Sequence, residues 1–511
     1  MLNESQQKTV AHESGHLLII AGPGTGKTHT LTHRIACLTQ SLSTGQKILA
    51  VTFTNKAAEE MRERLTARLD SDLAQVTIGT FHSFCLQILR EFADRTHLPK
   101  DFKVALPEDI AGLVKDLWPK ESARERKERL EKISRAKSNT HGGVQNFEPL
   151  HVFDQFLRSR GLIDFDDILG ETLTLLTSNT TVADSLRRRY GHICVDEYQD
   201  INPVQNALLK ELVQDDVHIT AIGDPNQAIY GFRGSDVKFF DCFDNDFPGA
   251  QIIRLNENYR STANLIKAGY QMISVGAQNS VPLQVAKIFT QGQLIVHAAA
   301  TDRAESEYVV HQIEKLVGGT SMFSRDSGRV TESASTQRSF GDIAVLYRLK
   351  AQTRALKDAF ERSGIPYHVA GEVQEKHADA DAAALRQREE SLPYSVEKVS
   401  LMTLHAAKGL EFPVVFIVGC EENLLPLNFP GMTTDPGEER RLLYVGMTRA
   451  KEQLYLTRAG RRLLFGQTCT NPPSPFLSDI EEDLKAYAPS ELKKKRIRVE
   501  PIEKQMELFG Y

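Results

Sequence analysis

The stretch Ala21–Thr28, with the sequence AGPGTGKT, decides the fold of this chain. It follows the apolar run His16–Ala21 (HLLIIA) and precedes a helical pattern, which predicts a buried strand, a tight turn and a helix. Glycine N–H groups and the N-terminus of a helix together attract phosphate oxygens. We expect Lys27 to reach the β- and γ-phosphates of a nucleotide and the Thr28 hydroxyl to bind Mg²⁺. The predicted phosphate cradle consists of Ala21 (where the usual pattern has Gly), Gly22, Pro23, Gly24, Thr25, Gly26, Lys27 and Thr28.

A pair of carboxylates follows a second apolar run. His192–Val195 (HICV) predicts a buried strand, and Asp196 and Glu197 come directly after it. A phosphate-binding loop works with carboxylates at the end of a neighbouring strand. We expect Asp196 to hold Mg²⁺ through water, and Glu197 to orient and deprotonate the attacking water.

Strand-like apolar runs, each followed by a small-residue turn and a helical pattern, recur along the chain. This alternation is typical of an α/β fold with parallel sheets covered by helices. The pattern returns late in the chain, so we expect two α/β cores that are separated near Asn256–Ser261. The further runs are Lys47–Thr52 and His218–Ile222 in the first core, and Ile343–Leu346, Val399–Leu404 and Val414–Val418 in the second.

Composition excludes several classes of protein. The 511 residues hold 62 Lys and Arg against 67 Asp and Glu, so nucleic acid could be bound only in a local groove and not by bulk charge. No apolar run reaches the roughly 18 residues of a membrane helix, and the N-terminus lacks a signal-peptide pattern. The six cysteines are scattered without a C-x-x-C pair, which disfavours a disulfide framework and a zinc site. We expect a cytoplasmic protein without a membrane partner.

A third block, Gly223–Gly234 (GDPNQAIYGFRG), follows another strand-like run. Gln227 is placed to sense a γ-phosphate, and Tyr230 and Phe232 offer flat faces to nucleobases. Stacking of a base on an aromatic side chain contributes roughly 1–3 kcal/mol and tolerates any base. Taken alone, such aromatic residues lie in cores more often than on base-stacking surfaces, so both interpretations stay open at this point.

These three blocks, in this order, resemble the UvrD/Rep/PcrA-type superfamily 1 DNA helicases, and the resemblance extends from about Leu2 to Leu484. In Leu2–Gln6 (LNESQ), the resemblance implies that Gln6 reads adenine. In Leu255–Ser261 (LNENYRS), it implies that Tyr259 stacks on adenine and that Arg260 contacts the γ-phosphate. In Glu438–Lys451 (EERRLLYVGMTRAK), it makes Arg449 the arginine finger. The implied catalytic set is Glu197, Lys27, Arg449, Arg260 and Gln227, with ATP and Mg²⁺ as cofactors.

The resemblance also implies contacts to single-stranded DNA and to DNA junctions. Beside Tyr230 and Phe232, the residues are Phe53, Asn55, Phe81 and His82 in the first core and Thr403 and His405 in the second. Glu411 is expected near the nucleotide cleft, and His29 takes a place where relatives often have Arg against the base.

The implied architecture is two RecA-like domains with parallel sheets and a small helical insertion. We expect the first RecA-like domain at 1–90 and 164–255, the insertion at 91–163, the second RecA-like domain at 256–485 and a flexible tail at 486–511. Relatives carry a whole additional helical domain where this chain has only Gly371–Lys398, so that domain is expected to be missing here. The carboxylates Asp164, Asp166 and Asp167 are interpreted as the cap of a helix and not as a metal site.

The extreme C-terminus resembles the peptide by which bacterial proteins bind the sliding clamp. Its residues are Gln505, Met506, Glu507, Leu508 and Phe509, where Glu507 departs mildly from the pattern. Leu508 and Phe509 could enter an apolar pocket while Gln505 bonds its rim. A tail that docks on its own body is the alternative.

We therefore expect an ATP-dependent DNA helicase or translocase in repair or replication, and the resemblance implies that it moves 3′ to 5′ along single-stranded DNA. Two alternatives stay open. One is a translocase that displaces proteins with little unwinding, and the other is a clamp-tethered, ATP-switched DNA-binding adaptor.

Overall fold

The computed structural model describes residues 2–69, 72–138, 147–214, 216–275, 284–318, 338–371, 397–429 and 432–488. Most of Gly371–Lys398 and the peptide at 505–509 therefore lie outside the described residues. The chain divides into two compact units, residues 1–260 with 282–288, and residues 261–281 with 289–511. Each unit is described by itself.

The first unit is built on a six-stranded sheet in which every pairing is parallel. Residues on β1 alternate between two apolar layers, with Leu17 and Ile19 in one and Leu18 in the other. Both faces of the sheet are therefore buried, which explains the continuous apolar runs in the sequence. In spatial order the strands are β3 (Val76–Thr80), β2 (Lys47–Thr52), β6 (Tyr190–Val195), β7 (His218–Gly223), β1 (Leu17–Ala21) and β8 (Gln251–Leu255).

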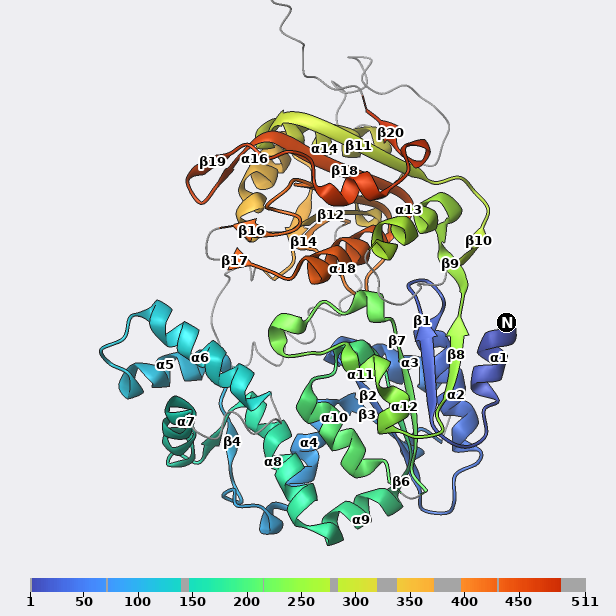
Figure 1. Cartoon of the computed structure of the whole chain (residues 1–511), viewed down its shortest axis with the longest axis vertical. Helices are drawn as coiled ribbons and strands as arrows, with labels where there is room; N and C mark the ends of the chain where they lie inside the picture. Colours follow the sequence, from blue (N-terminus) through green and yellow to red (C-terminus); the bar gives the residue numbers. More distant parts are fainter. Residues whose placement is uncertain are drawn as a thin grey trace, which may run out of the picture. The chain divides into compact units, whose positions relative to one another are not determined.

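Helices cover both faces of this sheet (Figure 1). Ala58, Met61 and Leu65 are buried on one face of the helix at Asn55–Leu69, as the helical spacing predicts. One layer contains α2 (Lys27–Thr39) and α3 (Asn55–Leu69), and the other contains α4 (Phe81–Glu91), α8 (Phe165–Ser178), α9 (Thr180–Arg189), α10 (Pro203–Leu212), α11 (Lys238–Asp241) and α12 (Phe243–Asp246). A short helix, α1 (Glu4–Val10), packs against α2.

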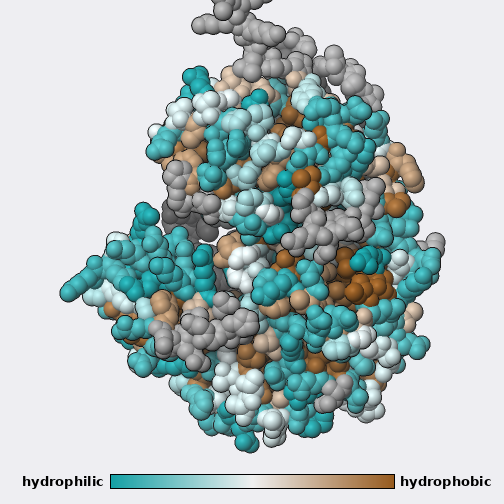
Figure 2. Space-filling model, viewed as in Figure 1, coloured by the Kyte–Doolittle hydropathy of each residue, from teal (hydrophilic) through white to brown (hydrophobic). Residues whose placement is uncertain are grey.

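Three helices inserted between α4 and α8 form a small helical subdomain (Figure 1). They are α5 (Pro107–Leu117), α6 (Ala123–Lys137) and α7 (Glu148–Arg158), and the short parallel strands β4 (Lys103–Val104) and β5 (Leu162–Ile163) pair at their base. Val114, Ile133, Phe153 and Leu157 form a separate apolar core. Figure 2 shows a largely hydrophilic surface over α5 and α6.

The second unit holds another parallel sheet, in the order β13-β14-β12-β15-β18-β11-β20. Its long strand β18 lies between β11 and β15 and turns back antiparallel into β19. At the end of β18, the guanidinium of Arg462 is buried between the carboxylates of Glu305 and Glu421. The strands are β11 (Gln293–Thr301), β12 (Ile343–Tyr347), β13 (Tyr367–Val369), β14 (Val399–Thr403), β15 (Phe412–Ile417), β18 (Ala450–Leu464), β19 (Gln467–Cys469) and β20 (Ala486–Tyr487); the main helices are α13 (Ala263–Ser274), α14 (Asp302–Leu316), α16 (Thr353–Ser363) and α18 (Pro436–Met447).

The predicted α/β class with two parallel sheets is confirmed. A two-stranded ribbon, β9 (Glu257–Thr262) with β10 (Val285–Ile288), lies where the chain passes between the units. Residues 256–260 group with the first unit, so the contact boundary falls after Arg260 and not after Leu255. None of the described helices is long and apolar enough to cross a membrane.

The stability of the first unit is expected to fall in mild acid because of a buried histidine on β6. Burial, with the nearby His218 and Arg34, lowers the pKa of His192 to about 4, and its Nδ1 has no hydrogen-bond partner among the described residues. In an unfolded chain the pKa is about 6.5, so below that pH the unfolded state takes up the proton and the folded state loses stability down to about pH 4.

We expect His192 to cost about 1–2 kcal/mol of unfolding free energy between about pH 7 and pH 5, after allowance for its partial exposure. Urea denaturation followed by circular dichroism measures this loss, because Trp118, the single tryptophan, packs in the separate core of the helical insertion. His192→Val should flatten part of the pH dependence, and an unchanged slope would contradict the assignment.

Candidate functional site

The loop between β1 and α2 has the shape of a phosphate cradle. Gly24 and Gly26 have φ of 73° and 82°, in the left-handed region where glycine is favoured. The Thr25 hydroxyl donates to the Gly22 carbonyl at 2.8 Å, and the Gln6 amide donates to the Thr25 carbonyl at 3.0 Å. Gln6 is buried and comes from α1, so the loop is held from inside and from a separate helix.

Lys27 lies at the centre of the charges in this site. Its ammonium donates to the carbonyls of Ala21 at 3.2 Å and Gly22 at 3.4 Å. Burial lowers the pKa of Lys27, as does Arg260, whereas the carboxylates of Glu197, Asp224 and Asp196 raise it. The ammonium therefore belongs to a group of charges drawn from the ends of β1, β6 and β7 and from β9.

The two predicted carboxylates follow β6 as expected. The Asp196 N–H donates to the carbonyl of Val51 at 2.9 Å, which fixes Asp196 against β2. Glu197 has a φ of 50°, an unusual backbone for a non-glycine residue, and such strain is characteristic of functional sites. The Gln199 amide donates to Glu197 Oε2 at 2.5 Å, while its Oε1 accepts from the Asp224 N–H at 2.9 Å. Gln199 thus aims the Glu197 carboxylate.

Gln227 is hydrogen-bonded to a member of the charge group around Lys27. It is buried, and its Nε2 donates to Asp224 Oδ2 at 2.7 Å. Burial raises the pKa of Asp224, and Lys27 opposes that shift. Gln227 therefore contacts the charge group through Asp224. No motif in the sequence had indicated a role for Asp224.

The strand β9 packs directly on the phosphate cradle. The Tyr259 N–H donates to the Gly24 carbonyl at 2.8 Å, and the Asn258 amide donates to the Pro23 carbonyl at 2.7 Å. A Cβ placed on Gly24 would lie 2.6 Å from the Cβ of Arg260, so Arg260 adjoins the loop. Tyr259 and Arg260, predicted from the resemblance to face a nucleotide, are thus brought to the P-loop within the first unit.

Gln284 is a further neighbour of the cradle that no sequence motif indicates. Its Oε1 accepts from the Asn258 amide at 2.7 Å, and its Nε2 would lie 1.7 Å from a Cβ on Gly22. Only the pairing of β10 with β9 brings this residue to the loop.

Further polar and aromatic side chains come from α1, from Tyr259 and from the start of α2. Asn3 caps α1 and donates to the hydroxyl of Tyr259 at 3.0 Å, and the Tyr259 side chain is 46% exposed. The rings of His29 and His33 lie 4.2 Å apart. Burial lowers the pKa of His29, and His33 and nearby arginines add to the shift, at the position predicted to face the base.

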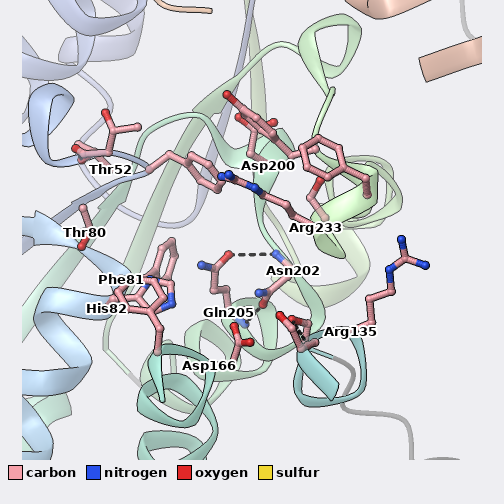
Figure 3. A pocket seen from close by; sticks show the side chains of 18 of the residues that line it. Thr52, Thr80, Phe81, His82, Arg135, Asp166, Asp200, Asn202, Gln205 and Arg233 are labelled. Carbon is pink, nitrogen blue, oxygen red and sulfur yellow. Dashed lines mark hydrogen bonds between the residues drawn. The ribbon is translucent and has the colours of Figure 1, made fainter. Parts of the chain in front are cut away.

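A groove of about 720 Å³ opens elsewhere on the first unit (Figure 3). It brings together all six of the first-core residues predicted to contact DNA: Phe53, Asn55, Phe81, His82, Tyr230 and Phe232. Phe53 and Tyr230 stack with ring centroids 5.2 Å apart at an interplanar angle of 15°, and Phe232 lies next to Tyr230 and is 50% exposed. Phe81 differs from the others because it is 6% exposed and packs mainly into the core.

The groove also contains residues that sequence reasoning missed. Phe165 is 53% exposed and stacks on His82 with ring centroids 3.8 Å apart, and burial lowers the pKa of His82 to about 4. The Arg233 guanidinium lies 5.7 Å from the Tyr230 ring centroid. Asn202 and Gln205 line the groove from α10. The sequence assigned the region of Phe165 to helix capping alone, because the exposure of this ring cannot be read from the sequence.

In the second unit, Arg449 is 2% exposed, and its guanidinium is hydrogen-bonded to backbone carbonyls of the same unit. Its guanidinium donates to the carbonyls of Val445 at 2.8 Å and Leu410 at 3.1 Å. Glu411 pairs with Lys451 at 2.8 Å. Thr403 ends β14, and its hydroxyl accepts from the Ala406 N–H at 3.2 Å, which shapes the turn that carries His405.

Comparison with known proteins agrees with this geometry. Residues 2–248 match the UvrD/REP helicase N-terminal domain, and residues 253–375 and 380–461 match the UvrD-like helicase C-terminal domain. The chain belongs to the UvrD/Rep helicase family. It is 28% identical to the ATP-dependent DNA helicase PcrA of Staphylococcus epidermidis, over 94% of this chain and 87% of the relative. It is 27% identical to the PcrA helicase of Staphylococcus aureus, over 94% and 86%.

The UvrD-type chain is shorter than these relatives within the aligned region. The alignment to the Staphylococcus epidermidis protein has 649 positions, whereas 94% of 511 residues is about 480, so about 170 positions of the relative have no counterpart here. A difference of this size is that of a whole domain.

The close approach of β9 to the loop makes Gly24 intolerant of a side chain. Gly24→Ala would combine a left-handed backbone with a contact of 2.6 Å to Arg260, whereas Gly45→Ala has a similar φ of 84° and open space around it. We expect Gly24→Ala to weaken binding of a fluorescent ATP analogue at least about tenfold, or about 1.4 kcal/mol. Gly45→Ala should leave binding unchanged, and equal affinities for the two variants would contradict this reading of the loop.

Proposed function

We propose that this protein is an ATP-dependent DNA helicase or translocase that moves 3′ to 5′ along single-stranded DNA. One observation carries the proposal: the segment after β7 joins the nucleotide site to the aromatic groove. Gln227 bonds Asp224 beside Lys27, and Tyr230, three residues on, stacks on Phe53 in the groove. A change at the phosphates can therefore reach a base-stacking platform through a short, rigid connection.

The residues of the nucleotide site suit phosphoryl transfer to water. Glu197, oriented by Gln199, is the proposed base that takes a proton from the attacking water. Lys27, Arg260 and Gln227 are proposed to balance the charge that develops on the γ-phosphate. Thr28 and Asp196 supply hydroxyl and carboxylate oxygens, the ligands that Mg²⁺ prefers, and the ion would supply further charge neutralisation.

The groove suits single strands better than duplex DNA. Its charged lining residues are two basic (Arg135 and Arg233) and three acidic (Glu131, Asp166 and Asp200). Affinity in the groove must therefore come mainly from base stacking, which requires unpaired bases. Thr403, His405 and Arg449 are proposed to contribute DNA contacts and the arginine finger from the second unit, so that ATP turnover becomes stepping along the strand.

The chemistry is tested with two variants that affect different steps. Lys27→Ala should abolish ATP turnover by weakening phosphate binding, whereas Glu197→Gln should bind ATP yet lower DNA-stimulated turnover at least about 100-fold, because the base is lost. The measurements are the steady-state ATPase rate with oligo-dT and ATP binding by fluorescence. Near-normal turnover by Glu197→Gln would show that Glu197 is not the base.

Direction and activity are tested with duplexes that carry a single-stranded tail. Strand separation on a 3′ tail and not on a 5′ tail is expected. Protein displacement without strand separation would favour the translocase alternative. This alternative matters for this chain because about 170 aligned positions of the PcrA relative have no counterpart in it. ATP binding that changes DNA affinity without directional movement would favour the adaptor.

We also propose that the C-terminal peptide binds the bacterial sliding clamp. Its support is the resemblance of Gln505, Met506, Leu508 and Phe509 to clamp-binding peptides. A peptide of residues 500–511 is expected to bind with a Kd of micromolar order, or about −8 kcal/mol. Leu508→Ala with Phe509→Ala should remove binding and leave the ATPase unchanged. Absence of binding at tens of micromolar, or a loss of ATPase activity instead, would contradict the proposal.

A further inference from the structure

A buried lysine joins the helical insertion to the first core. Lys137 is the last residue of α6, and its side chain is 7% exposed. Its ammonium lies 2.7 Å from Asp154 Oδ1 on α7, 2.7 Å from Asp164 Oδ2 and 2.6 Å from Asp167 Oδ1 at the start of α8. Three helices thus converge on one ammonium group.

Helix capping explains only half of the carboxylate oxygens at the start of α8. Asp164 Oδ1 accepts from the Asp167 N–H at 2.8 Å, and Asp167 Oδ2 accepts from the Asp164 N–H at 3.0 Å, which forms the predicted cap. The remaining oxygen of each residue is turned to Lys137. The cap therefore serves a second purpose, which is to hold the end of α6.

The same two segments form walls of the aromatic groove. Ser134, Arg135 and Ser138 line it from the end of α6, and Phe165 and Asp166 line it from the first turn of α8. Figure 3 shows Arg135 and His82 on different sides of the groove, with Asp166 and Gln205 between them. Phe165, next to the Lys137 contact at Asp164, stacks on His82. The position of Lys137 thus determines how far α6 stands from a base-stacking surface.

Charge explains why this contact is hard to replace. Burial raises the pKa of Asp164 to about 7, against the effect of Lys137, and also raises the pKa of Asp154. Burial alone would lower the pKa of Lys137, but Asp164, Asp167 and Asp154 reverse this effect and raise it. One ammonium bonds three carboxylates, and Arg158 is a further cation near Asp154 and Asp167. Loss of Lys137 would remove the bonds that join α6 to α7 and α8 and leave the carboxyl groups to neutralise by taking up protons.

We propose that Lys137 is a positioning residue for the DNA groove: it clamps the end of α6 to the capped start of α8 and so sets the separation of the groove walls. Lys137 itself does not contact the bases. This inference rests on the proposed function, since it takes the groove to be the site of single-stranded DNA.

The test compares Lys137→Met with Lys132→Met, which removes an exposed charge from the same helix. Affinity for fluorescent oligo-dT is measured by anisotropy, together with DNA-stimulated ATPase. For Lys137→Met we expect DNA affinity to fall about tenfold and the half-saturating DNA concentration to rise in step. The maximal ATPase rate and the KM for ATP should stay unchanged, and Lys132→Met should change DNA affinity less than about twofold.

A second variant covers the case in which Lys137→Met fails to fold. Lys137→Met combined with Asp154→Asn, Asp164→Asn and Asp167→Asn removes the ammonium and its three carboxylate partners, and Asn at positions 164 and 167 preserves the cap, but the Lys137 contact is absent. This variant should fold and still bind oligo-dT about tenfold more weakly. Wild-type DNA affinity in either variant, or an equal loss of ATP affinity, overturns the proposal. A wild-type protein without DNA-stimulated ATPase would instead overturn the proposed function.

Discussion

The enclosed ammonium of Lys27 is the interaction on which the arrangement of the first unit depends. Its neighbours Asp196, Glu197, Asp224 and Arg260 come from the ends of β6, β7 and β9, which are far apart in the sequence. A parallel sheet brings the carboxyl ends of its strands to one edge, and there a single positive charge can be balanced by carboxylates from several strands. The site is therefore a property of the sheet edge and not of the loop alone.

The proposed coupling of nucleotide and DNA rests on the same edge. β2 leads into Phe53, β3 into His82 and β7 into Tyr230, so three strands of one sheet edge end at the groove. β7 also leads into Asp224 beside Lys27, so this strand serves both sites. The connection after β7 is fixed by the hydrogen bond between Gln227 and Asp224. The helical insertion adds one wall to the groove, and the contact of Lys137 with Asp164 and Asp167 holds that wall in place.

The β9–β10 ribbon gives the P-loop a second set of contacts. Hydrogen bonds from Asn258 and Tyr259 reach the carbonyls of Pro23 and Gly24, just where the chain passes from the first unit to the second. These hydrogen bonds tie the shape of the loop to β9, the strand in which the chain leaves the first unit. This is a physical reason for Tyr259 and Arg260 to lie on the connecting strand and not inside either sheet.

The sequence by itself determined the strands, the P-loop and the carboxylate pair, because glycine spacing, apolar runs and local helix caps act over a few neighbouring residues. The resemblance of its motifs to those of the helicase family also indicated the six aromatic and polar residues that line the groove. Only the tertiary structure decided that Phe165 stacks on His82, that Gln284 reaches Gly22 and that Lys137 serves both Asp164 and Asp167. These contacts join residues that are not related by the spacing of a helix or a strand. They therefore form only when the sheet and its insertion have folded.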